Sequence, residues 1–257
     1  MAIAKMAVLR MTVAGLAALP LSMALAQQRP EPKDTEVWAP EPARVAPGAI
    51  DAAPSDAVLL FNGKDLGEWV SSNDPGKPAD WTVADGAFTV RGGSGDIQTR
   101  RSFTDYQLHL EWRAPASSSG SGQGRGNSGV FLASTGNGSG YELQILDCVD
   151  NKTYVNGQAA SIYKQHIPLV NACAAAGEWQ RFDVIWTAPR FGADGKLVSP
   201  AHVTALHNGV LVQNHVALQG ESLHVGKPTY RQHGALPIRL QDHGDAVSFR
   251  NVWVRPL

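Results

Sequence analysis

Apolar and polar residues alternate along several stretches of the chain with a period of two, which is typical of β-strands. In residues 106–113, four apolar side chains alternate with Gln, His, Glu and Arg. Residues 141–146 and 181–187 follow the same pattern. Each stretch therefore predicts a strand with one apolar and one polar face.

Shorter apolar runs separated by turn sequences predict the remaining strands. They span residues 57–61, 81–90, 128–133, 200–206, 209–217, 236–241 and 246–254. Asn208-Gly209 lies inside the clearest hairpin, over residues 203–212. No segment has a long helical period. The pattern predicts an all-β fold, a sandwich or jelly roll of two antiparallel sheets with few short helices.

The first 26 residues have the pattern of a secretory signal peptide, with Lys5 and Arg10 before an apolar stretch and an Ala-x-Ala site ending at Ala26. The alternative is an uncleaved membrane anchor. Residues 27–55 are rich in proline and predict an extended linker. We therefore expect a folded domain over residues 56–257 in a periplasmic or secreted protein.

Composition narrows the class of protein. The 257 residues carry a net charge of −1 and 43% hydrophobic residues, as in an ordinary globular protein. The basic excess of a nucleic-acid-binding protein is missing, so we expect no nucleic-acid partner. Beyond the signal sequence there is no apolar run long enough to span a membrane, and we expect no membrane span in the mature chain.

The chain contains two cysteines, Cys148 and Cys173. In an exported protein an even number of cysteines predicts a disulfide, and only one pairing is available here. Two free thiols are the alternative. A zinc site built on cysteine is disfavoured, since the chain has no CxxC sequence.

Seven short motifs occur in a characteristic order along the domain. They are LFNGKDLGEW at 60–69, WTVADGAFTV at 81–90, GDIQTRRSFTDYQLHLEWR at 95–113, NSGVF at 127–131, GYELQILD at 140–147, GEWQRFDV at 177–184 and LQDHGDAVSFRNVWVRPL at 240–257. In this order they resemble the 3-keto-disaccharide hydrolase domain family. The chain departs from the usual pattern in the Gly/Ser tract 117–126 and in residues 157–166, which we expect near the ligand cleft.

The resemblance implies a concanavalin A-like, laminin G-like jelly roll that cleaves the glycosidic bond of 3-keto-glucosides or 3-keto-disaccharides. An oxidised sugar or glycoside would then be the partner. The implied chemistry is removal of the C2 proton, elimination of the group at C1 and hydration. Such a site needs a base, an acid and donors that stabilise an enolate oxygen.

The candidate catalytic residues are Glu142, Asp147 and His243. Glu142 and Gln144 share a strand face. A β-bulge at 145–146 would bring Asp147 to the same face. The spacing is also similar to the E-x-D-x-x-E signature of laminarinase-type glycosidases, with Gln144 replacing the central acid. The alternatives are a solvated strand face for Glu142 and a turn histidine for His243.

The candidate substrate-binding residues are polar side chains near these positions. They are Glu111, Arg113, Asn127, Ser128, Gln144, Tyr163, Lys164 and Gln241. A surface ion pair is the alternative for Glu111 and Arg113, and turn chemistry for Asn127 and Ser128. Five further histidines are interpreted as structural or surface residues: His202, His207, His215, His224 and His233.

Two questions stay open at this stage. The metal site is unknown, although Glu142, Asp147, Asp150 and Asn151 could offer oxygen ligands to Ca²⁺. The competing functions are a non-catalytic carbohydrate-binding module, a glycosidase acting on unoxidised glycans and a structural domain of the cell envelope.

Overall fold

The computed structural model describes residues 30–49 and 52–257, so the predicted signal sequence lies outside the described residues. The chain separates into two units, Met1–Ala43 and Arg44–Leu257. In the first unit, residues 30–43 are all exposed and contain the short 3-10 helix η1 (Pro32–Thr35). The second unit contains the β-structure and the candidate site. None of the described helices is long and apolar enough to cross a membrane.

The second unit is built on two antiparallel sheets. The larger sheet has the order β13-β12-β9-β6-β15-β4-β3, with β1 paired to β15. Its strands are β1 (Val58–Leu59), β3 (Thr82–Ala84), β4 (Ala87–Thr89), β6 (Tyr106–Arg113), β9 (Gln180–Thr187), β12 (His202–His207), β13 (Val210–Ala217) and β15 (Ser248–Pro256).

The smaller sheet has the order β2-β5-β14-β7-β8. Its strands are β2 (Trp69–Ser71), β5 (Ile97–Thr99), β14 (Arg239–Leu240), β7 (Ser128–Gly136) and β8 (Ser139–Ile145). A separate ribbon pairs β10 (Arg190–Phe191) with β11 (Leu197–Ser199). The described helices in this unit are the 3-10 turns η2 (Gly122–Gly124) and η3 (Val155–Gly157).

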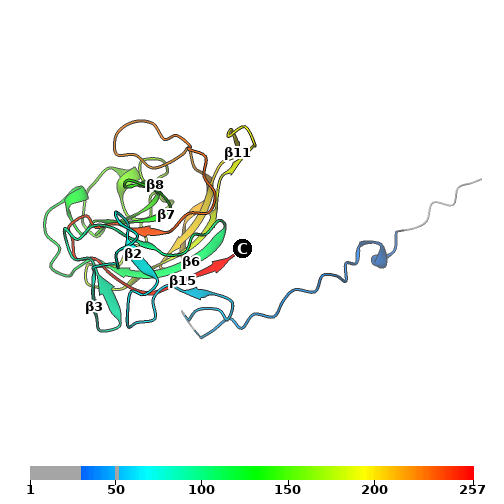
Figure 1. Ribbon diagram of the computed structural model, residues 1–257, viewed down its shortest axis with the longest axis horizontal. Helices are drawn as coiled ribbons and strands as arrows, with labels where there is room; N and C mark the ends of the chain where they lie inside the picture. Colours follow the sequence, from blue (N-terminus) through cyan, green and yellow to red (C-terminus); the bar gives the residue numbers. More distant parts are fainter. Residues whose placement is uncertain (1–29, 50–51) are drawn as a thin grey trace, which may run out of the picture. The chain divides into compact units, whose positions relative to one another are not determined.

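The hydrophobic core lies between the two sheets, whose strands run as two layers (Figure 1). The apolar face of β6, with Leu108, Leu110 and Trp112, is fully buried in this core. Leu143 of β8 contributes to it from the other sheet. Burial of these alternating side chains is the main force that holds the layers together. The predicted all-β, two-sheet jelly roll is confirmed.

The strand predictions fail where strands are short. Residues 81–90, predicted as one strand, form the hairpin β3–β4 because the chain turns at Asp85, which has a positive φ of 51°, and Gly86. Strands β2, β5, β10 and β11 were not predicted from the pattern. Each has only two or three residues, too few to display an alternation.

The register of the smaller sheet determines which side chains can build a site. Arg239, Phe131 and Glu142 are direct neighbours across β14, β7 and β8, so they share one face. The next row, with Val130 and Leu143, points into the core. The outer face of this sheet therefore carries a carboxyl, an aromatic ring and a guanidinium side by side.

Cys148 and Cys173 form a disulfide, as predicted. It links the segment that follows β8 to the segment that precedes β9. The alternative of two free thiols does not hold. The bond therefore closes a loop within the single connection between β8 of the smaller sheet and β9 of the larger sheet.

Candidate functional site

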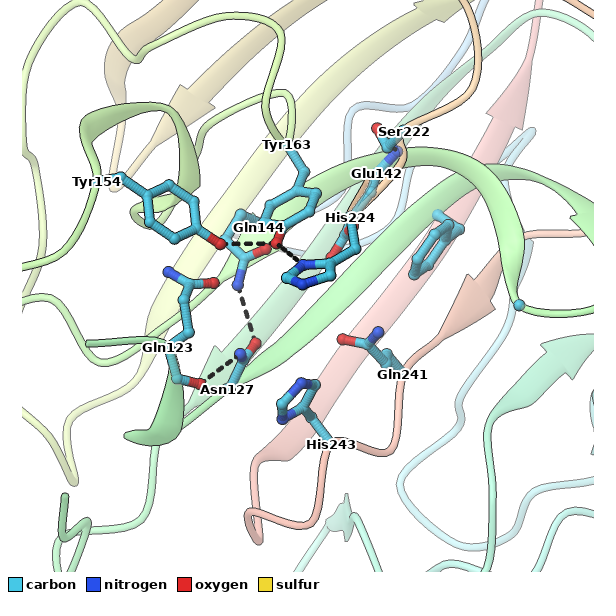
Figure 2. Close-up of a pocket in the computed structure, with 12 residues that line it drawn as sticks. Gln123, Asn127, Glu142, Gln144, Tyr154, Tyr163, Ser222, His224, Gln241 and His243 are labelled. Carbon is cyan, nitrogen blue, oxygen red and sulfur yellow. Dashed lines mark hydrogen bonds between the residues drawn. The ribbon is translucent and has the colours of Figure 1, made fainter. Parts of the chain in front are cut away.

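A cavity of about 400 Å³ lies against the outer face of the smaller sheet (Figure 2). Strands β7 and β8 supply its floor, and loops supply its walls. The lining residues are Gln123, Asn127, Phe131, Gly138, Glu142, Gln144, Tyr154, Tyr163, Ser222, His224, Gln241 and His243. Its size and its mixture of aromatic and polar side chains are typical of a small-molecule site.

Glu142 is the single carboxyl group among the described residues that line the cavity. Its side chain is only 6% exposed. No described residue donates a hydrogen bond to its carboxyl oxygens. Burial raises the pKa of Glu142 to about 8, Arg239 opposes this shift and Asp96 adds to it. The carboxyl group is therefore poised to exchange a proton near neutral pH.

The backbone holds Glu142 in place. Its N–H donates to Ser222 Oγ at 3.1 Å, and its carbonyl accepts from the N–H of Tyr163 at 3.0 Å. Gly129 leaves room for its side chain, because a Cβ atom at that position would lie 2.5 Å from Glu142 Oε1. The glycine of the NSG sequence thus allows the carboxyl group to lie across β7.

Arg239 of β14 lies in the same cross-strand row as Phe131 and Glu142, and its side chain is fully buried. Its guanidinium forms an ion pair with Asp96 and stacks on the ring of Phe131, with Cζ 3.4 Å from the ring centroid. Asp96 also accepts the backbone N–H of Asp242 at 2.8 Å. The Arg239–Asp96 pair therefore anchors the loop that carries Gln241 and His243, and it places a cation near Glu142.

A hydrogen-bonded series of side chains forms one wall. Tyr154 Oη lies 2.7 Å from Tyr163 Oη, which lies 3.2 Å from His224 Nδ1 (Figure 2). The Nζ of Lys164 donates to the carbonyl of His224. Burial raises the pKa of Tyr163 above its ordinary value, and the Tyr154 hydroxyl adds to this shift. Tyr163 thus keeps its proton, and the three side chains could pass a proton to a bound ligand.

Amide side chains form a second series. Gln144 Nε2 donates to Asn127 Oδ1 at 2.9 Å, and Asn127 Nδ2 donates to the carbonyl of Gln123 at 2.7 Å. In the view of Figure 2, Gln241 and His243 lie on the opposite side of the cavity from Tyr154 and Tyr163. The cavity therefore offers amide groups and an imidazole opposite the tyrosines.

The structure brings together six of the predicted site residues, and their roles remain predictions. These are Glu142, His243, Asn127, Gln144, Tyr163 and Gln241. Glu142 and Gln144 share the outer face of β8, as their spacing predicted. The solvated strand face does not describe them, because loops cover this face and both side chains are buried.

Asp147 lies outside the cavity lining, contrary to expectation. Strand β8 ends at Ile145, so no bulge returns Asp147 to the face of Glu142. Instead, Asp147 Oδ2 accepts from Arg125 Nε at 2.8 Å. Asp147 is buried, and its partly buried ion pair with Arg125 anchors the end of the Gly/Ser tract 117–126.

Glu111 and Arg113 lie on β6 in the other sheet, and neither lines the cavity. Glu111 accepts from Arg250 Nε at 2.6 Å, and Arg113 lies 4.5 Å above the ring of Trp179. The expectation that they join the site with Glu142 is wrong, since they belong to the outer face of the larger sheet.

Ser128 and Lys164 border the site without lining it. Ser128 is buried and donates to the carbonyl of Gln241 at 2.7 Å, so it positions that loop. The Nζ of Lys164 lies 5.7 Å from the centroid of the Tyr163 ring, in addition to its bond to His224. Both therefore support residues of the cavity.

Sequence reasoning missed four polar lining residues: Gln123, Tyr154, Ser222 and His224. All four lie on loops or short turns, where no periodic pattern indicates an orientation. His224 in particular was interpreted as structural or surface, and its contact with Tyr163 corrects this. The Gly/Ser tract and residues 157–166 do supply cavity residues, namely Gln123 and Tyr163.

The described residues do not supply a set of ligands for the Ca²⁺ ion considered from the sequence. Within residues 30–49 and 52–257, no group of three or more His, Cys, Asp and Glu side chains could hold a metal ion. Asp147 is engaged by Arg125, and Asn151 Nδ2 donates to the Asp147 carbonyl at 2.7 Å.

The fold and the site define a concanavalin A-like jelly roll with a ligand-sized cavity on the outer face of its smaller sheet. Residues 56–255 match the family described as "3-keto-alpha-glucoside-1,2-lyase-like domain". The chain belongs to this family. The resemblance inferred from its sequence motifs is thereby confirmed.

Individual relatives agree with this assignment. A 3-keto-disaccharide hydrolase of Bacteroides thetaiotaomicron is 28% identical over 240 residues, which cover 78% of each chain. A crystal structure of a candidate glycosyl hydrolase from Parabacteroides distasonis is 46% identical, with a TM-score of 0.82. It covers 88% of this chain and 97% of its own. A second candidate glycosyl hydrolase from that organism, 21% identical with a TM-score of 0.57, shares the fold.

Proposed function

We propose that this protein is a carbohydrate hydrolase that cleaves the glycosidic bond of 3-keto-glucosides. The observation that carries the proposal is the buried carboxyl group of Glu142, which no described residue hydrogen-bonds and which shares a cavity with the Tyr154–Tyr163–His224 series. Family membership and the relatives named as hydrolases support it.

The ketone at C3 makes the proton on C2 acidic. Glu142 in its ionised form removes this proton, and the electron pair of the C2–H bond forms an enolate with the C3 oxygen. The enolate then collapses: the C1–O bond breaks, a C1=C2 double bond forms and the C3 ketone returns. The leaving oxygen takes a proton from the wall of the cavity. Water adds to C1 and a proton returns to C2, so the net reaction is hydrolysis.

The remaining lining residues suit the other tasks. Tyr163 retains its proton and can supply it to the leaving oxygen, with His224 as the group that restores it. Gln241 and His243, across the cavity, can donate hydrogen bonds to the C3 oxygen where negative charge develops. Asn127 and Gln144 can bind the sugar hydroxyls.

The content of the cavity favours elimination over ordinary glycoside hydrolysis. Retaining and inverting glycosidases use a pair of carboxyl groups on either side of the scissile bond. Here Glu142 is the single carboxyl group in the described lining. An α-proton abstraction needs only one base, because the ketone supplies the electron sink.

Turnover of a methyl 3-keto-glucoside beside methyl glucoside tests the proposal. We expect cleavage of the keto sugar and, for the unoxidised parent, a rate at least about 10³-fold lower, because no enolate can form without the ketone. Release of methanol measures both reactions. Equal cleavage of the two sugars would favour a glycosidase, and binding without cleavage of either would favour a carbohydrate-binding module.

We also propose that the chain is exported to the periplasm or secreted. The signal-like pattern of residues 1–26 and the disulfide between Cys148 and Cys173 support this, since disulfides persist in oxidising compartments. The mature protein, purified from its native cells, is expected to begin at Gln27, and N-terminal sequencing measures this. A chain that retains Met1 and stays in the cytoplasmic fraction would contradict export.

A further inference from the structure

A second hollow adjoins the cavity and has a different chemistry. It measures about 570 Å³ and shares Tyr154 with the cavity as a common wall. Its other lining residues come from the segments after Tyr154 and Tyr163 and from β13. We call it the side groove. A ligand whose sugar occupies the cavity and whose C1 substituent passes Tyr154 would place that substituent in the side groove.

The side groove offers aliphatic surface to solvent. Val155 is 60% exposed, Ile167 56% and Leu169 62%. Three side chains of this kind around one hollow are unusual for a surface that meets only water. An apolar ligand would gain free energy by covering them.

The polar side chains of the side groove are largely engaged inside the protein. Gln165 Nε2 donates to the carbonyl of Gly220 at 3.0 Å, and Gln213 Nε2 to that of Ala160 at 2.9 Å. His166 Nε2 lies 2.9 Å from the carbonyl of Ala217. Asn156 and Asn214 are the lining residues whose side-chain amides make no hydrogen bond to another described residue. A second sugar, with several hydroxyl groups, would find few partners here.

The absence of charged side chains from the described lining of the side groove also favours a neutral, largely apolar ligand. The described lining of the side groove contains no Asp, Glu, Lys or Arg side chain. An anionic or cationic substituent would lose its hydration without gaining an ion pair. A neutral aromatic ring that carries at most a few hydroxyl groups matches the aliphatic walls and the two free amides.

We infer that the side groove is the binding site for the leaving group, and that the preferred substrate of this enzyme is a 3-keto-glucoside with a neutral aromatic aglycone. The inference rests on the proposed function and adds to it the class of leaving group. The aglycone departs as a neutral alcohol or phenol after its oxygen takes a proton from the Tyr163 side of the cavity.

The first test compares 2-phenylethyl and methyl 3-keto-glucosides, whose leaving groups are both simple alkanols. We expect kcat/KM to be about tenfold higher for the phenylethyl compound, because the ring buries apolar surface. Leu169→Asn should remove most of this advantage of the phenylethyl compound over the methyl compound, through a higher KM for the phenylethyl compound. Val198→Asn, an equally simple change at a residue that is 73% exposed on β11, is the matched control.

The second measurement is independent of turnover. Titration of the wild-type protein with unoxidised 2-phenylethyl and methyl glucosides should show the tighter Kd for the phenylethyl compound, and Leu169→Asn but not Val198→Asn should weaken it. Failure to cleave any 3-keto-glucoside would refute the proposed function, while this titration would still decide on the groove. Equal Kd values for the two glucosides, or equal effects of the two variants, would overturn the inference.

Discussion

Glu142→Gln is expected to lower the rate of 3-keto-glucoside cleavage by about 10³-fold, because an amide cannot remove the C2 proton. The substrate Kd should change little, since glutamine has the same shape and Glu142 accepts no described hydrogen bond through its carboxyl group. Single-turnover kinetics and a binding titration with the methyl 3-keto-glucoside measure the two effects separately. Glu68→Gln is a suitable control, since the carboxyl group of Glu68 lies outside the cavity and forms a partly exposed ion pair with Arg101 at 3.2 Å.

The pH dependence gives the same residue a second signature. Because the base must be ionised, kcat/KM of the wild type should rise with pH and level off above about 8. The free energy of unfolding should instead decrease as the pH rises. Between the ordinary pKa of 4.5 and about 8, the folded protein keeps a proton that the unfolded chain loses, so stability falls as pH rises through this interval.

Each pH unit of that interval corresponds to at most about 1.4 kcal/mol. Glu142→Gln should remove the loss of stability with rising pH that the Glu142 carboxyl group causes. Urea unfolding of both proteins at pH 5 and pH 8.5 would measure this difference. A variant that keeps the activity of the wild type would eliminate Glu142 as the base. An unchanged pH dependence of stability would show that its carboxyl group is not perturbed by burial.

Arg239→Ala is expected to destabilise the protein by about 3–5 kcal/mol, because it leaves Asp96 without its cation and removes the stacking on Phe131. Arg239→Lys keeps the charge but not the planar contacts, so we expect a smaller loss. Urea unfolding at pH 7 measures both. Arg91→Ala, at an exposed ion pair with Asp80, should cost no more than about 1 kcal/mol.

Arg239→Ala should also shift the pH profile of kcat/KM. Arg239 is the cation that opposes the raised pKa of Glu142, and Asp96 acts in the other direction. Where Arg239→Ala still folds, the midpoint of its kcat/KM profile should therefore lie above that of the wild type. A loss of stability no larger than that of Arg91→Ala would contradict the structural role assigned to Arg239.

The alternation of apolar and polar residues determined much of this protein. It predicted the long strands β6, β8 and β9, the two-sheet sandwich and the shared face of Glu142 and Gln144, because a strand's period fixes which side chains point the same way. The two cysteines left a single possible disulfide. Together with the order of the motifs, these features indicated the fold and the family.

The tertiary structure alone decided where the site lies. A period of two separates the faces of a strand but does not say which outer face loops will cover, so it placed both Glu111 of β6 and Glu142 of β8 on polar faces without showing that only Glu142 lines the cavity. The loops that bring Tyr154 and His224 to the cavity have no periodic pattern. Asp147 lies beyond the end of β8 and forms an ion pair with Arg125. Contacts between residues far apart in the chain depend on how the loops close, which local patterning does not encode.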